Sequence, residues 1–108
     1  LPVFSIGTND GRTCAAEVAD AVRAPCLGAT AFDTVENGRF KGGWTTRHYG
    51  QPDTGVHAVQ MELAQRAYLT AEAAPWHYAP DIAAPLRTTL GHILQFLDTL
   101  ARSGVLNR

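Results

Sequence analysis

A short polar segment in the middle of the chain has the residue types that bind an anionic ligand. Residues 45–50 (TTRHYG) combine a guanidinium, an imidazole, a phenol and two hydroxyls, and glycine-containing stretches flank them. Because a guanidinium binds a carboxylate through paired hydrogen bonds, Arg47 could anchor an acidic substrate. A lone Arg in a loop is more often a surface residue. The mixed donors around it, His48 among them, and a second histidine nine residues later, His57, favour a binding role.

Glu62 is the candidate general base. The run VHAVQMEL at 56–63 alternates, so a strand is expected with His57, Val59, Met61 and Leu63 on one face and Ala58, Gln60 and Glu62 on the other. Ligands of α/β sheets commonly bind at the carboxyl ends of strands, and Glu62 stands near that end. A carboxylate there can take a proton from a water molecule. A solvated face of an edge strand explains Glu62 equally well from the pattern alone.

The histidines do not form a metal-ligand motif. HxxE, HExxH and tight His/Cys clusters are all missing among the four, which are His48, His57, His77 and His92. The two cysteines, Cys14 and Cys26, lack CxxC spacing and are too few for a disulfide scaffold. We therefore expect no complete metal site within this chain.

Alternating strands and helices are expected to position these residues, which predicts the α/β class. Strands are expected at 3–7, 32–36 and 56–63, and a short strand or ordered loop at 44–49. One helix is expected at 14–24, with Thr13 as its cap and Pro25 ending it, and a second at about 82–102. An irregular crossing is expected at 70–80.

The loop 8–13 (TNDGRT) follows the first predicted strand and carries further polar side chains. Asn9 and Arg12 could line a pocket there, although loop formation explains them as well. They are the last of the candidate site residues that the pattern offers.

Composition limits the classes of function. A chain of 108 residues has room for one domain. With 9 basic and 10 acidic residues and no basic face, nucleic acid is not an expected partner. No apolar run approaches the roughly 18 residues that a membrane span needs. We also expect no signal peptide, because the first residues lack a basic region and a long apolar stretch. A cytoplasmic location is the default expectation.

A long part of the sequence resembles a known family. The run NGRFKGGWTTRHYGQPDTGVHAVQMELAQRAYL resembles the C-terminal signature of N-formylglutamate amidohydrolases. The opening FSIGTNDGRTCA resembles a segment that follows a central Asp-Ala-His-Ser motif in that family, and WHYAPDIAAPLRTTLGHILQFLDTL is similar to its final helix. The resemblance implies that residues 1–108 are the C-terminal part of a single amidohydrolase domain.

The resemblance carries expectations about fold and activity. It implies part of a three-layer α/β/α zinc-carboxypeptidase-like (phosphorylase/hydrolase-like) domain with a mixed sheet. It implies hydrolysis of N-formyl-L-glutamate to formate and L-glutamate, in histidine degradation, with the zinc ligands upstream of this chain. Glu62 then corresponds to the general base and Arg47 to the donor for the substrate carboxylates. Contact with the substrate is also expected of His48, His57, Asn9 and Arg12.

Two other functions stay open at this point. One is a related hydrolase of another N-acyl amino acid, and the other is a non-catalytic domain that binds an acidic ligand or a protein partner. A piece of a larger sheet would also expose apolar surface worth several kcal/mol, at about 25 cal/mol per Å2. Homo-oligomerisation, disorder or a missing portion of chain is therefore expected.

Overall fold

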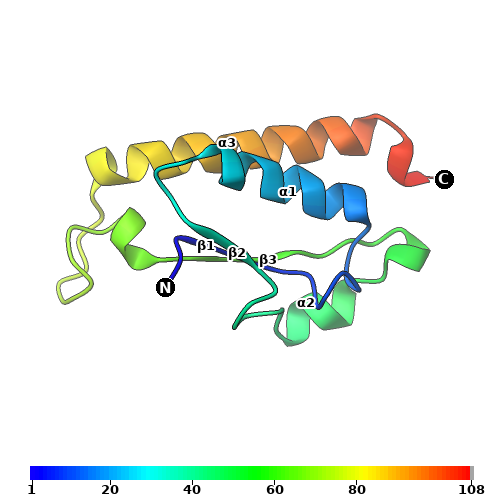
Figure 1. Ribbon diagram of the computed structural model, residues 1–108, viewed down its shortest axis with the longest axis horizontal. Helices are drawn as coiled ribbons and strands as arrows, with labels where there is room; N and C mark the ends of the chain where they lie inside the picture. The colour runs from blue at the N-terminus through cyan, green and yellow to red at the C-terminus, as the bar shows by residue number, and fades with distance from the viewer. Residues whose placement is uncertain (108) are drawn as a thin grey trace.

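Three strands form one mixed sheet, and two helices cover one of its faces (Figure 1). The computed structural model describes residues 1–107. The strands are β1 (Phe4–Gly7), β2 (Thr34–Glu36) and β3 (Gln60–Leu63), in the order β2-β1-β3. The covering helices are α1 (Ala16–Gly28) and α3 (Pro80–Arg102), and the short α2 (Trp44–Tyr49) lies on the opposite side of the sheet. The expected α/β class and mixed sheet are confirmed.

The core lies between the sheet and the two long helices. Phe4 and Ile6 of β1 are fully buried, and they pack with Val22 and Cys26 of α1 and with Leu86 of α3. Alternate residues of a strand point to the same face, so β1 and β3 direct their apolar residues at the helices and the intervening residues at the other face. That second face carries the polar side chains of β3.

The direction of β3 alters the reasoning about Glu62. β1 is parallel to β2 but antiparallel to β3, with Ser5 opposite Glu62 and Gly7 opposite Gln60. Glu62 does stand near the carboxyl end of its strand, as expected. That end lies beside the start of β1, however. The carboxyl ends of β1 and β2 lie at the opposite end of the sheet. The rule for parallel sheets therefore does not place Glu62 in a ligand site.

The predicted limits of α1 are wrong at both ends. The helix begins at Ala16, and Thr13 does not cap it, because the Thr13 hydroxyl donates a hydrogen bond to the Ala58 carbonyl over 2.7 Å. The helix also continues past Pro25 to Gly28. Cys26 is fully buried in the core, and this packing outweighs the hydrogen bond that Pro25 cannot make.

Residues 44–49 form a helix, so the expected strand or ordered loop there is wrong. The amide of Arg47 donates to the Gly43 carbonyl and that of Gly50 to the Thr46 carbonyl, at 3.1 and 3.0 Å. Thr46 is buried. Strand propensity depends on a neighbouring strand to pair with, and here the helical bonds satisfy the backbone instead.

The third strand is shorter than expected, because 56–59 pairs with other segments. The Ala58 amide donates to the Thr13 carbonyl over 2.9 Å, and Val56 forms a bridge with Gln51. The crossing at 70–80 is irregular, as expected, with one bridge between Leu69 and Tyr78.

The last helix leaves part of its apolar stripe open. α3 begins at Pro80, slightly earlier than expected, and runs through Pro85 because Leu86 beyond it is buried. Leu94 is 68% exposed, at the rim of an apolar groove of about 290 Å3. The groove is lined by Val22, Val59, Met61, Leu90, Ile93, Leu94 and Leu97. Among the described residues, no helix is long and apolar enough to cross a membrane.

Two leucines of α3 give a matched test of this packing. Leu86→Ala should lower the free energy of unfolding of the chain by about 2–5 kcal/mol, because it leaves a cavity in the core. Leu94→Ala should change it by no more than about 0.5 kcal/mol, because that side chain is exposed. Urea denaturation followed by circular dichroism measures both values. Equal losses would contradict the arrangement of α3.

Candidate functional site

The candidate site begins where a loop crosses the open face of the sheet. A Cβ added to Gly7 would lie 2.8 Å from the carbonyl carbon of Lys41 and 2.9 Å from the amide nitrogen of Gly42, so only glycine fits there. The Asn9 amide also donates to the Lys41 carbonyl, over 2.6 Å. A salt bridge of 3.2 Å joins the Lys41 ammonium to Asp10. The loop is thus fixed to the end of β1.

The next residue of that loop connects to the polar face of β3. The Gly43 amide donates to Oε1 of Gln60 over 2.7 Å, and the Thr46 hydroxyl donates to the same oxygen over 3.4 Å. On its other side, Nε2 of Gln60 donates to Oε1 of Glu62 over 3.4 Å. A continuous chain of hydrogen bonds therefore runs from the start of α2 to the carboxylate of Glu62.

Glu62 is exposed, and it borders a small recess. The recess has a volume of about 110 Å3. Apart from Glu62, the recess is lined by residues of the N-terminus, of β1 and β3, and of the loop after β2: Leu1, Pro2, Ser5, Phe40, Leu63 and Ala64. A carboxylate beside partly apolar walls, open to water, is placed to exchange a proton with a bound molecule.

The short helix α2 presents a cation and aromatic rings next to this network. Nε of Arg47 donates to the Gly43 carbonyl over 3.4 Å, and the side chain is exposed. His48 stacks on Trp44 with ring centroids 4.3 Å apart, and Tyr49 meets His48 edge-on at 4.7 Å. Of the expected site residues, Arg47 and His48 thus belong to the loop and helix that contact Gln60, and Asn9 contacts this loop through its hydrogen bond to Lys41.

His57 and Arg12 are placed differently. Nδ1 of His57 accepts the Ala15 amide over 3.0 Å, at the start of α1, which leaves the proton of a neutral imidazole on Nε2. Nε2 is buried and has no hydrogen-bond partner within residues 1–107. Arg12 is exposed in the loop after β1. For both residues, contact with a substrate stays a prediction.

Sequence reasoning gave no role to Gln60, Gly43 or Gly7. The alternation of β3 did place Gln60 on the face of Glu62, which was a signal for it. The other two could not be found from sequence, because their importance comes from contacts across 17 and more positions of the chain.

No group of three or more His, Cys, Asp or Glu side chains within residues 1–107 lies close enough to hold a metal ion. The two cysteines are buried apart from the polar face. Burial raises the pKa of the Cys26 thiol to about 11 and also raises that of Cys14, which disfavours the thiolate that binds metals. The donors within residues 1–107 therefore do not fit a zinc site.

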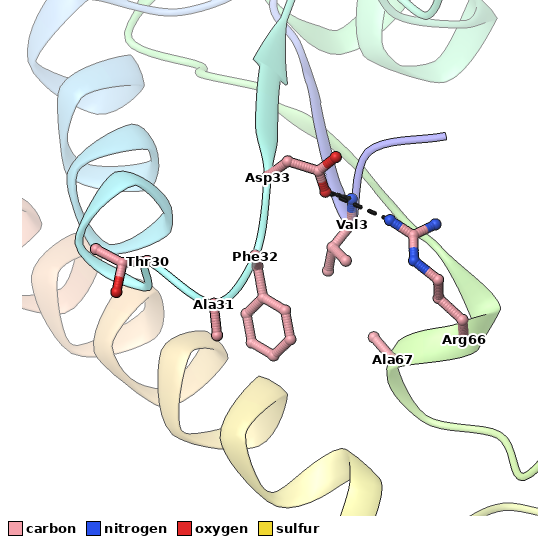
Figure 2. A pocket seen from close by; sticks show the side chains of 7 residues that line it. All are labelled: Val3, Thr30, Ala31, Phe32, Asp33, Arg66 and Ala67. Atoms are coloured by element: carbon pink, nitrogen blue, oxygen red, sulfur yellow. Dashed lines mark hydrogen bonds and ion pairs between the residues drawn. The ribbon is translucent and has the colours of Figure 1, made fainter.

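A second recess lies where β1 and β2 begin, at the same end of the sheet as Glu62 (Figure 2). Oδ1 of Asp33 accepts the Val3 amide over 2.7 Å and lies 3.4 Å from a guanidinium nitrogen of Arg66. The hydrogen bond from the Val3 amide, with smaller contributions from the amide of Asp33 itself and from the Arg66 charge, holds the pKa of Asp33 below its usual value. These bonds join the residues before β1 and β2 to the turn after β3. The group of Val3, Asp33 and Arg66 therefore stabilises this end of the sheet.

Comparisons with known proteins point to one family. Residues 1–69 match the family model described as N-formylglutamate amidohydrolase. N-formylglutamate deformylases of Pseudomonas aeruginosa and Pseudomonas putida are 47% and 45% identical over 97 residues, which is 90% of this chain. The chain spans only 36% of the length of either relative.

A solved structure has the same fold over nearly the whole chain. The crystal structure of N-formylglutamate amidohydrolase from Ralstonia eutropha JMP134 matches with a TM-score of 0.78 and 22% identity. The match covers 95% of this chain and 36% of that one.

The position of His57 predicts a structural effect of its removal. His57→Ala should lower the free energy of unfolding by about 0.5–2 kcal/mol, because the Ala15 amide at the start of α1 loses its acceptor. His92→Ala, on the exposed face of α3, is the matched control and should be nearly neutral. Thermal unfolding of both variants measures the difference. A His57→Ala chain as stable as the parent would show that the contact does not stabilise α1.

Proposed function

Since the chain belongs to the N-formylglutamate amidohydrolase family, we propose that it forms the C-terminal part of an enzyme that hydrolyses N-formyl-L-glutamate to formate and L-glutamate. The single observation that carries the proposal is the hydrogen-bonded path from Gly43 through Gln60 to Glu62, next to the helix of Arg47. The relatives, which are N-formylglutamate deformylases, indicate the substrate. A place in histidine degradation is part of the same proposal.

Glu62 is the proton carrier in this proposal. Water adds its oxygen to the formyl carbon, and Glu62 accepts the proton that the water releases. Glu62 then delivers that proton to the leaving nitrogen as the C–N bond breaks. The products are formate and L-glutamate, and the carboxylate returns to its starting state. Its exposure and the recess beside it support access for both water and substrate.

Arg47 is the anchor for the substrate. A carboxylate of N-formylglutamate matches the paired donors of a guanidinium, and Arg47 is exposed on α2 beside the Gln60 network. The aromatic group of Trp44, His48 and Tyr49 on the same helix can contact the aliphatic part of the substrate.

Zinc enters the proposal through residues outside this chain. Residues 1–107 do not offer a fitting set of donors. We propose that the ligands stand upstream in a polypeptide of family length, within a three-layer zinc-carboxypeptidase-like domain. The 36% share of the relatives' length supports this, because most of a family member lies outside the matched region.

Replacement of the base tests the assignment of Glu62. In a polypeptide of family length that contains this region, Glu62→Gln should reduce kcat by about 10²-fold or more, because the amide cannot accept the proton. The zinc content, measured by atomic absorption, should stay that of the parent. Glu72→Gln, an exposed change in the irregular crossing, is the control. Near-normal formate release by Glu62→Gln would rule out this role.

Removal of the anchor should affect substrate binding more than turnover. In the same polypeptide, Arg47→Ala should raise the KM for N-formylglutamate by about tenfold or more, through loss of a charge-assisted contact worth about 1.5–3 kcal/mol. Arg102→Ala, at the far end of α3, should leave KM unchanged. Initial rates of formate release at varied substrate concentration give both constants. An unchanged KM for Arg47→Ala would exclude it from the binding site.

A further inference from the structure

We propose that Gln60 is a positioning residue, which orients Glu62 for proton transfer and couples it to the helix that carries Arg47. This inference rests on the proposed function, in which Glu62 is the base and Arg47 the anchor. It assigns to Gln60 a role that requires both ends of its amide group. The two ends have different partners in the structure.

The orientation of the Gln60 amide is determined by its neighbours. The Gly43 amide can only donate, and it lies 2.7 Å from Oε1 of Gln60, so an oxygen must occupy that position. The Thr46 hydroxyl also donates to this oxygen. A flipped amide would place its NH2 group against the Gly43 N–H. Nε2 must therefore face Glu62, where it can only donate.

This donor restrains the carboxylate without occupying it. Nε2 of Gln60 lies 3.4 Å from Oε1 of Glu62 and leaves Oε2 for a water molecule. Both residues belong to the open face of β3, two positions apart, so the strand itself keeps them adjacent. Such contacts are often long in the absence of substrate and shorten in the reacting complex. The carboxylate is thus held ready with one oxygen free.

The same amide ties β3 to α2 through a single residue. The N–H of Gly43 bonds to Gln60, and its carbonyl accepts the backbone amide of Arg47 over 3.1 Å. The Lys41–Gly42 peptide beside it rests directly on Gly7. The position of Arg47 relative to Glu62 is therefore fixed through Gly43 and Gln60. This connection would suit a substrate with a carboxylate at a set distance from the bond to be cleaved.

Two substitutions of Gln60 test the hydrogen bond of its oxygen and that of its nitrogen separately. Gln60→Glu keeps an oxygen for the Gly43 amide but removes the donor to Glu62 and adds a second carboxylate beside it. In the polypeptide of family length we expect kcat to fall about tenfold to a hundredfold with little change in KM. The acid limb of kcat/KM should also move to higher pH, because a neighbouring negative charge disfavours the charged form of Glu62.

Gln60→Met removes both ends, so kcat should fall and KM should rise together. Gln95→Glu on the exposed face of α3 is the matched control and should change neither constant. A purely structural role for Gln60 would leave the kinetics and pH profile of a folded Gln60→Glu enzyme normal, and that result would overturn the inference. If thermal melting shows that Gln60→Glu does not fold, a folded Gln60→Met enzyme with normal kcat overturns it equally.

The Glu62→Gln enzyme distinguishes this failure from failure of the proposed function. Normal turnover by Glu62→Gln would reject the base itself and the inference with it. Loss of turnover in Glu62→Gln together with normal kinetics and a normal pH profile in Gln60→Glu would keep the base and reject only the positioning role.

Discussion

The contact of the Lys41–Gly42 peptide with Gly7 sets the geometry of the polar face. There is no room for a Cβ at Gly7, so the loop lies directly on the backbone of β1. From that position the Gly43 amide reaches Gln60, and α2 begins at the next residue. A side chain at Gly7 would lift the loop and separate the helix of Arg47 from β3. The absence of a side chain at Gly7 thus allows α2, which carries Arg47, to lie next to β3, which carries Glu62.

The sequence predicted the elements that depend on local patterns. The buried strand β1, the long helix α3 and the irregular crossing follow from short apolar runs, helical periodicity and proline content. The predictions failed where distant partners decide the structure. Thr13 bonds to Ala58 and does not cap α1, and residues 44–49 wind into a helix in the absence of a pairing strand. No local pattern contains the direction of β3, because strand pairing fixes it.

The candidate site shows the same division between local and distant information. Arg47 and Glu62 could be selected from residue type, and resemblance to a family gave them separate roles. That they belong to one network could not be predicted, because Gly43 and Gln60 are 17 positions apart and have no distinctive sequence context. His57 illustrates the reverse case. Its chemistry made it a candidate, yet in the fold its Nδ1 accepts the amide of Ala15, the residue immediately before α1.

The way in which the two functional residues are held matters for the chemistry. Proton transfer and substrate alignment lose about 10²-fold in rate for a displacement of about 1 Å. Side chains that are both exposed, as Arg47 and Glu62 are, would drift by more than that without support. In this structure the backbone of Gly43 supports both residues. Its N–H donates to Gln60, and its carbonyl accepts the amide of Arg47. A glycine packed on a glycine leaves little freedom at that point, so the loop region 41–43 supplies rigidity to an otherwise open surface.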